Sequence, residues 1–226
     1  MPRHLTLLQR DEELEFYRSI CEDVNVLVDI GCRSNHDYHN IKPEAENHLF
    51  DCCSFHIDSL REKIGDNDKV YLYDYGLSNK TEEVSYNEGS ESIFGGGGET
   101  VRVKKFDDAM MELGIDRKID FLKIDIEGGE PSILEFVDVI KRIKYVQFEF
   151  GYTWPDRKSY DIHNVIEQYK DTFDFFYMKD WAHPVYKGTD MELLTPMSNE
   201  LCEQLEQHSN GRNGGNIVMI YRKDPQ

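Results

Sequence analysis

The stretch DFLKIDIEGGEPSIL, residues 120–134, is the most informative part of the chain. Its apolar residues are typical of a buried strand, yet Lys123, Asp125 and Glu127 alternate with them, and Glu130 follows two glycines. Charged groups near a core are costly unless they are paired, solvated or used for function. The stretch therefore predicts a buried strand that carries functional side chains at its carboxyl end.

Similar apolar stretches alternate with amphipathic ones along the chain. We expect strands over 25–31, 48–53, 69–78, 119–126, 145–150, 173–178 and 216–223, and helices over 9–23, 54–64 (with Ser54 as N-cap), 106–115, 130–141 and 159–171. This alternation predicts an α/β fold with a mostly parallel, doubly wound sheet. In such sheets ligands bind at the carboxyl ends of the strands.

Two segments depart from this alternation. Residues 80–105 read as an antiparallel hairpin around the glycines at 95–98, which form either a hinge or a plain hairpin tip. Residues 36–47 precede the second strand, but Pro43 interrupts them, so we expect a short or irregular helix there. The 226 residues fit one domain over 1–226, with residues 1–23 forming an N-terminal helix that packs on it.

The bulk composition excludes several classes of protein. A formal charge of −18 disfavours binding to nucleic acid or to anionic membranes, both of which require cationic surfaces. No apolar run approaches the roughly 20 residues of a membrane span, and the first residues do not resemble a signal peptide. The five cysteines have no disulfide-framework spacing. We expect reduced thiols and a cytoplasmic location.

The first two strands end in a pattern that suits a nucleoside. Asp29 and Gly31 close the first strand, and Asp51 follows 20 residues later at the end of the second, where an acid can accept hydrogen bonds from ribose hydroxyls. Arg33 and Ser34 replace later glycines of a pyrophosphate-binding loop, so a nucleoside without phosphates fits better. The alternative is a plain turn at Gly31 and a solvated acid at Asp51.

The end of the third strand is a candidate adenine site. Asp74 could bond to the amino group of the base, or Tyr75 could pack on it; a plain turn is the alternative. We also expect Cys52 and Gly76, at the same edge of the sheet, to contact this ligand.

Taken together, several stretches resemble the FkbM-type S-adenosylmethionine-dependent methyltransferases. The stretches that carry the resemblance are VDIG (28–31), HLFDCCS (48–54), YGLSN (75–79), VKKFDD (103–108), IDFLKIDIEGGEPSIL (119–134), YVQFEF (145–150) and NIVMIYRK (216–223). The resemblance implies a Rossmann-like class I methyltransferase fold with a seven-stranded sheet, six strands parallel and one reversed, and helices on both faces. It also implies S-adenosylmethionine as methyl donor and O-methylation of a hydroxyl on a sugar, glycan or glycosylated small molecule.

The sequence departs from the family pattern at two cofactor positions. Asn35 replaces the second glycine of the first loop, and asparagine is among the residues that best tolerate a left-handed backbone. Asp51 replaces a glutamate that is one methylene longer.

Catalytic and acceptor-binding roles follow from the position of each residue in the sheet. Asp125 is our first candidate for the general base and also faces the donor, with Glu127 second and Lys123 as their support. Glu127 and Glu130 could hold the acceptor or the cofactor's ammonium group, although Glu130 could equally serve only to start a helix.

Further candidates lie at the end of the fifth strand and beyond it. Glu149 and Trp154 could form an acceptor wall, and His183 could be a second base. The alternatives are that the tryptophan packs in the core and that the histidine lies on the surface.

Three alternative functions compete with this hypothesis. The first is a zinc site drawn from Cys32, His36, His39, His48, Cys52, Cys53 and His56, although no C-x-x-C pair is present. The second is magnesium-assisted transfer through Asp125 and Glu149. The third is a catalytically silent methyltransferase-like module for binding or assembly, suggested by the altered glycine loop. We expect a cofactor-dependent enzyme without a metal.

Overall fold

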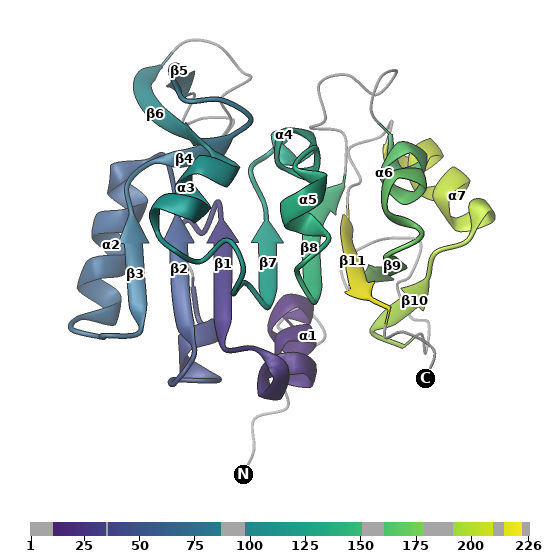
Figure 1. Cartoon of the computed structure of the whole chain (residues 1–226), viewed down its shortest axis with the longest axis horizontal. Coiled ribbons are helices and arrows are strands. Elements are labelled where there is room, and N and C mark those ends of the chain that lie inside the picture. Colours follow the sequence, from purple (N-terminus) through teal and green to yellow (C-terminus); the bar gives the residue numbers. More distant parts are fainter. Residues whose placement is uncertain are drawn as a thin grey trace.

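The computed structural model describes residues 11–34, 36–86, 98–150, 161–178, 192–209 and 215–222. Its main sheet has eight strands in the order β10-β9-β11-β8-β7-β1-β2-β3 (Figure 1). Their bounds are β1 Val26–Ile30, β2 Glu46–Phe50, β3 Val70–Tyr73, β7 Phe121–Ile124, β8 Tyr145–Phe150, β9 Phe173–Met178, β10 Leu194–Pro196 and β11 Gly215–Tyr221.

The strand directions confirm the predicted fold class. Strands β3, β2, β1, β7 and β8 run parallel, β11 is antiparallel to both β8 and β9, and β10 is antiparallel to β9. Six strands therefore share one direction. The expected seven-stranded sheet with one reversed strand is present, and β10 adds a second reversed strand at the edge. Proline is tolerated there because an edge strand needs fewer backbone donors.

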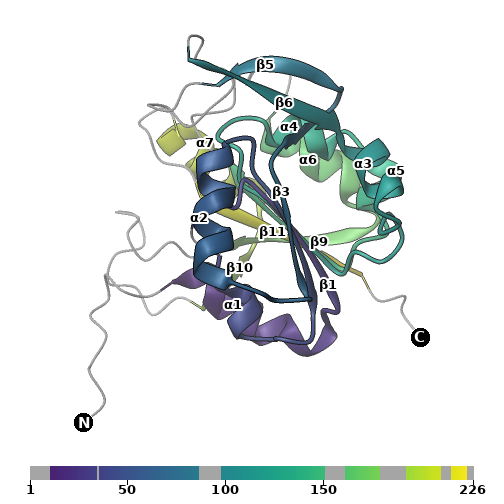
Figure 2. The same cartoon turned by 90° about the vertical axis from the view of Figure 1, so that its left-hand side faces the viewer.

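Helices cover both faces of the sheet (Figure 2). On one face lie α1 (Glu12–Ile20) and α2 (Ser54–Ile64); on the other lie α3 (Phe106–Glu112), α4 (Glu130–Leu134), α5 (Val137–Ile140) and α6 (Ile162–Tyr169). Helix α7 (Asn199–Ser209) joins the second group through Leu201, Cys202 and Leu205. Short 3-10 turns span Cys21–Asp23 and Tyr38–Asn40.

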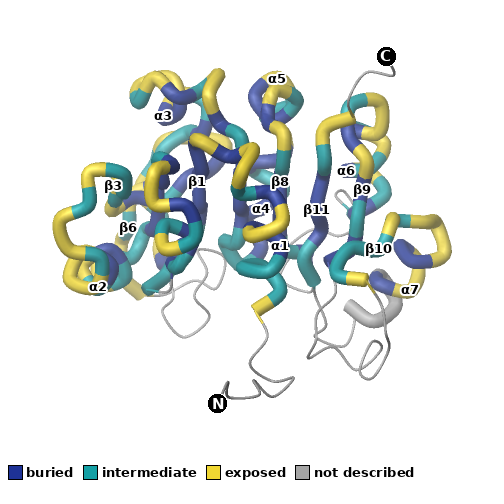
Figure 3. The backbone as a smooth tube through the Cα atoms, turned by 90° about the horizontal axis from the view of Figure 1, so that it is seen from below, coloured by how far each residue is buried: buried dark blue, intermediate teal, exposed yellow. Residues whose placement is uncertain are grey.

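Two apolar clusters, one on each face of the sheet, form the core. Phe16 and Tyr17 of α1 contact Phe121 of β7, with ring centroids 6.0 and 5.8 Å apart. Figure 3 shows central strands such as β1 and β11 buried, while the outer faces of the helices are exposed. Among the described residues, none of the helices is both long and apolar enough to span a bilayer.

A small second sheet lies above the carboxyl ends of β1–β3 (Figure 1). It contains β4 (Gly76–Ser78), β5 (Glu82–Tyr86) and β6 (Glu99–Lys105), and β5 pairs antiparallel with β6 as predicted. The strand expected over 69–78 is instead split between the two sheets. Gly76 permits this crossing, because a Cβ there would lie 3.1 Å from the Cβ of Cys52.

Other boundaries also differ from the prediction. The helix expected over 130–141 is two short helices, because Tyr169 and Gln168 of α6 donate to the carbonyl of Leu134 where the helix would have continued. Cys53 rather than Ser54 is the N-cap of α2, and its side chain makes no capping bond. Residues 36–45 contain one 3-10 turn, as expected for an irregular segment, and residues 46 and 47 already belong to β2.

Candidate active site

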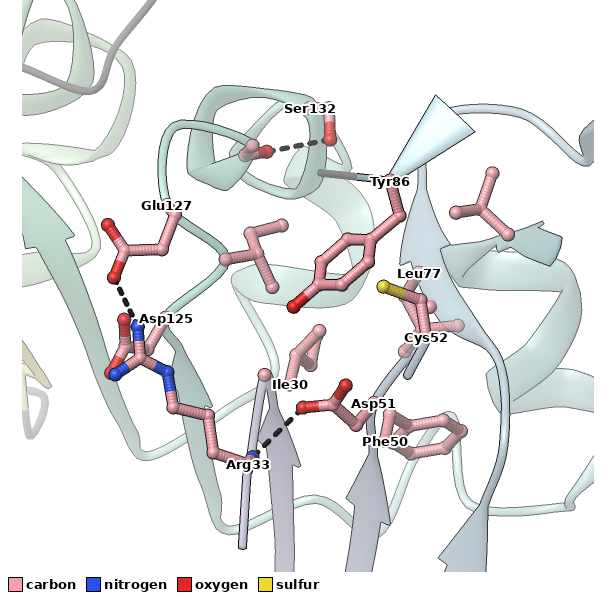
Figure 4. A pocket seen from close by; sticks show the side chains of 15 residues that line it. Ile30, Arg33, Phe50, Asp51, Cys52, Leu77, Tyr86, Asp125, Glu127 and Ser132 are labelled. Carbon is pink, nitrogen blue, oxygen red and sulfur yellow. Dashed lines mark hydrogen bonds and ion pairs between the residues drawn. The ribbon is translucent and has the colours of Figure 1, made fainter. Parts of the chain in front are cut away.

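A pocket of about 600 Å³, counting space open to solvent, lies at the carboxyl ends of β1, β2 and β7 (Figure 4). It is lined by Ile30, Gly31, Arg33, Phe50, Asp51, Cys52, Gly76, Leu77, Tyr86, Val103, Asp125, Ile126, Glu127, Gly129 and Ser132. Gly31 is required at its floor. With φ of +84°, a Cβ there would fall 1.8 Å from the carbonyl oxygen of Asp125, so only glycine lets the two strand ends meet.

Asp51 is positioned to bind two hydroxyls. Its side chain is held at the end of β2 by the backbone N–H groups of Arg33 and Cys53, which donate to Oδ2 and Oδ1, each at 2.9 Å. Burial raises the pKa of Asp51, while these donors oppose the rise. Each carboxylate oxygen has two acceptor sites, so each keeps one for a ligand. Asp51 can therefore accept from both hydroxyls of a ribose.

The residues expected around the base divide between two cavities. Cys52 and Gly76 line the pocket, whereas Asp74 lines a neighbouring cavity that shares Cys52 and Tyr86 with it. Tyr75 lines neither of them. Its ring packs on Phe50 in the core, and Lys104 lies 4.9 Å from the ring centroid. The expected contact between Tyr75 and the cofactor is therefore corrected to a packing role.

Asp29 also has a different place from the one expected. It is buried on the side of β1 away from the pocket, where Oδ2 lies 3.0 Å from Nδ1 of His36 and Oδ1 lies 3.8 Å from Nζ of Lys123. Burial alone would raise the pKa of Asp29, but Lys123 and His36 together lower it. Asp29 therefore does not line the pocket, and its carboxylate lies between His36 and Lys123 behind it.

Lys123 connects this buried side with the pocket. Its Nζ donates to Oδ2 of Asp125 at 2.9 Å and lies 3.6 Å from a carboxylate oxygen of Glu13, a residue of α1. Burial works to lower the pKa of Lys123, but Asp125, Glu13 and Asp29 raise it well above its ordinary value. The expected pairing of Lys123 with an acid is confirmed, and Lys123 acts as an ionised support for Asp125.

Three carboxylates gather at the carboxyl ends of β7 and β8. Oxygens of Asp125, Glu127 and Glu149 all lie within 4.8 Å of one another. Burial, followed by repulsion from Asp125 and Glu127, raises the pKa of Glu149 to about 8. At neutral pH Glu149 therefore holds a proton.

This group also has the composition of a magnesium site, because oxygen ligands suit hard cations. Two of its members already face a cation, since Asp125 lies beside Lys123 and Glu127 beside Arg33. The zinc alternative receives no support. Throughout the described part of the chain, no three of the candidate cysteines and histidines come close enough to share an ion.

Glu130 belongs to the turn between β7 and α4. It is 0% exposed, and its two carboxylate oxygens accept from the backbone N–H groups of Ile126 (2.8 Å) and Gly128 (3.0 Å). It therefore shapes the loop that carries Glu127. The expected role in binding the acceptor is corrected to this structural one, and the alternative of a helix-start residue is the better description.

Sequence reasoning missed the pairing of Arg33 with Glu127. Nη2 of Arg33 lies 2.6 Å from Oε1 of Glu127, at the edge of the pocket (Figure 4). Both residues have positive φ, +48° and +51°, and they are the two non-glycine residues of the described chain that do. Such backbone strain costs about 1–3 kcal/mol per residue. A partly exposed ion pair contributes only about 0–1 kcal/mol to stability. The stability gained from this pair therefore does not account for the backbone strain at its two residues.

Tyr86 was also missed. It is the last residue of β5, and its ring is directed into the pocket, beside Cys52 and above Asp51 in the view of Figure 4. Three predicted residues, Asn35, Trp154 and His183, lie outside the described residues, as do the glycines at 95–97.

A match to a family model spans this site. The Methyltransferase FkbM domain model matches residues 23–179, which contain every pocket-lining residue. A search of curated proteins gives no match.

The similar solved structures have low sequence identity to this chain. A methyltransferase FkbM from Methylobacillus flagellatus KT is 16% identical with a TM-score of 0.48, and the match covers 70% of this chain but only 41% of that one. A S-adenosylmethionine-dependent O-methyltransferase from Thermotoga maritima is 10% identical, with 99% and 70% coverage and a TM-score of 0.46. A putative rRNA methylase from Clostridium thermocellum is 12% identical, with 96% and 100% coverage and a TM-score of 0.49. On the strength of the family match, the chain belongs to the FkbM methyltransferase domain family.

Proposed function

We propose that the protein is an S-adenosylmethionine-dependent O-methyltransferase that acts on a hydroxyl of a sugar, glycan or glycosylated small molecule in the cytoplasm. The observation that carries the proposal is the pocket itself. Asp51, which we propose binds the ribose, and Asp125, which we propose faces the acceptor, both line this one cavity at the carboxyl edge of the sheet.

The residues present fit this cofactor. Asp51 retains acceptor sites for the ribose, and Gly31 leaves room for close backbone approach. The carboxylates of Asp125 and Glu127 create a negative potential that attracts a sulfonium. Cys52 and Leu77 offer an apolar wall for the base. When bound there, S-adenosylmethionine supplies an electrophilic methyl group.

The chain's own residues supply alignment and proton transfer. An acceptor hydroxyl that donates to Asp125 is oriented toward the pocket, and Asp125 takes its proton as the oxygen becomes a nucleophile. Lys123 donates a hydrogen bond to Asp125 and so holds its carboxylate in place. Protonated Glu149 can donate a hydrogen bond to a second acceptor oxygen, which favours polyhydroxylated acceptors such as sugars.

A screen of nucleotide-sugars, glycans and glycosylated metabolites with donor carrying a labelled methyl group tests the proposal. We expect label in an ether linkage on at least one sugar. Transfer to nitrogen or carbon, or to nucleic acid, would overturn the substrate class. No calorimetric binding of S-adenosylmethionine at millimolar concentration would instead support a catalytically silent module.

A further inference from the structure

We infer that Arg33 and Glu127 together bind the amino-acid end of the cofactor, the guanidinium taking the α-carboxylate and Glu127 accepting from the α-ammonium. This inference rests on the proposed function and assigns a subsite within it. In the structure the two side chains bond to each other, 2.6 Å apart, although they are 94 residues apart in sequence.

The position of the pair suits this end of the ligand. Arg33 and Glu127 line the same pocket as Asp51, on the side away from Cys52 and Tyr86 (Figure 4). The backbone N–H of Arg33 donates to Asp51, so the guanidinium is carried by the residue that holds the ribose acid in place. The amino-acid chain of the cofactor leaves the ribose at its 5′ carbon, away from the hydroxyls that would bond to Asp51, so its charged end must meet groups on another side of the same pocket.

The charges match a zwitterion. An α-carboxylate and an α-ammonium sit on one carbon, and the pocket offers one cation and one carboxylate side by side. Side-chain exposure of 43% for Arg33 and 23% for Glu127 lets each exchange its present partner for the ligand without leaving a buried charge unpaired. The neighbouring pair of Lys123 and Asp125 cannot do the same, because the lysine is 7% exposed and also lies beside Asp29 and Glu13.

Backbone conformation points the same way. Both residues adopt left-handed φ values that glycine would accept without strain, and glycine neighbours Glu127 in the chain. Strain retained at two positions that meet across one pocket is characteristic of a functional site. We therefore infer that the side chains of Arg33 and Glu127 are needed for function at these two positions.

Calorimetry with three ligands tests the inference. S-adenosylhomocysteine carries both charges, S-adenosyl-3-thiopropylamine lacks the carboxylate, and 5′-methylthioadenosine lacks both. We expect Arg33→Gln to weaken S-adenosylhomocysteine by roughly 10- to 100-fold and to leave the other two within about threefold. We expect Glu127→Gln to weaken both amine-bearing ligands and to spare 5′-methylthioadenosine.

Two further variants complete the design. Arg61→Gln breaks a comparable exposed ion pair with Asp58 on α2, away from the pocket, and should change no affinity. Arg33→Asn also removes the charge, and asparagine tolerates a left-handed φ. If Arg33→Gln does not fold, Arg33→Asn should show the ligand selectivity expected of Arg33→Gln.

The outcomes separate the two proposals. Equal weakening of all three ligands by the Arg33 variants, or no weakening of any, would overturn the subsite while the cofactor assignment stands. Failure of wild-type protein to bind any of the ligands would overturn the proposed cofactor, and the subsite with it.

Discussion

Replacing Asp51 by asparagine tests the cofactor site at the residue with the best-defined geometry. Asp51 is 7% exposed, and its two oxygens each accept one backbone N–H. Asparagine has nearly the same shape, but its amide nitrogen cannot accept a hydrogen bond. One ribose hydroxyl therefore loses its acceptor, and the other bonds to a neutral oxygen instead of a charged one.

The expected loss follows from these bonds. A hydrogen bond to a charged group contributes about 1.5–3 kcal/mol, and one between neutral groups about 0.5–1.5 kcal/mol. Losing one charged bond and weakening another gives about 3 kcal/mol, or roughly 100-fold in the dissociation constant.

Isothermal titration with S-adenosylhomocysteine and with 5′-methylthioadenosine measures this loss. Both ligands contain the ribose, so both should weaken together, unlike the selective effect expected at Arg33. Asp58→Asn, an exposed acid on the following helix, is the matched control, and Asp51→Glu should retain binding. A folded Asp51→Asn protein whose affinities change less than about threefold would refute the reasoning.

Four other perturbations have defined outcomes. Asp125→Asn should lower kcat by about 10²–10⁴ in a labelled-methyl assay, with a smaller change in cofactor affinity; an unchanged kcat would remove Asp125 as base. Lys123→Met leaves Asp29 and Asp125 without the lysine cation between them and should lower the free energy of unfolding, measured in urea, by about 3–5 kcal/mol. A loss of less than about 1 kcal/mol would contradict this role of Lys123. Because the pKa of Glu149 is raised to about 8 in the fold from an ordinary 4.5, the stability present while it stays protonated is lost as pH rises through 8. From pH 6 to pH 9 the ionisation of Glu149 should therefore lower the stability to urea by about 2–3 kcal/mol, and Glu130, whose pKa burial also raises to about 8, adds to the loss. Glu149→Gln should make the loss smaller by the share of Glu149, and a loss that is unchanged in that variant would contradict the reasoning. Chelation with EDTA should leave methyl transfer unchanged, since Lys123 and Arg33 already face two of the three clustered carboxylates; loss of activity restored by Mg²⁺ would favour the metal-assisted route.

The sequence predicted the parts of the site that depend on where strands end. Gly31, Asp51 and Asp125 each follow a buried strand, and parallel strands bring their carboxyl ends to one edge. The alternation of residues 120–126 likewise predicted that Lys123 and Asp125 share a face and pair.

The errors arise where a side chain's direction depends on residues distant in sequence. Asp29 and Ile30 point to opposite faces of β1, and only Ile30 lines the pocket. Lys123 of β7, which is distant in sequence, pairs with Asp29 on the other face. The pairing of Arg33 with Glu127 joins two loops through space, and nothing local to either loop indicates it.

Other misses had weak local signals. Glu130 bonds to backbone groups two and four residues before it, so an acid following two glycines could have suggested turn closure. Strand β10 has only three residues and ends in proline, too short for any periodicity to show. The carbonyl of Leu134 is occupied by α6, a tertiary contact that ends α4 where helical periodicity predicted continuation.

A crystal structure of the protein with S-adenosylhomocysteine tests the central claim most directly, because it locates the cofactor. The account predicts ligand density in this pocket, with both ribose hydroxyls within hydrogen-bond distance of the Asp51 carboxylate and the sulfur facing Asp125. Density at any other place on the molecule, or a ribose that does not contact Asp51, would contradict it.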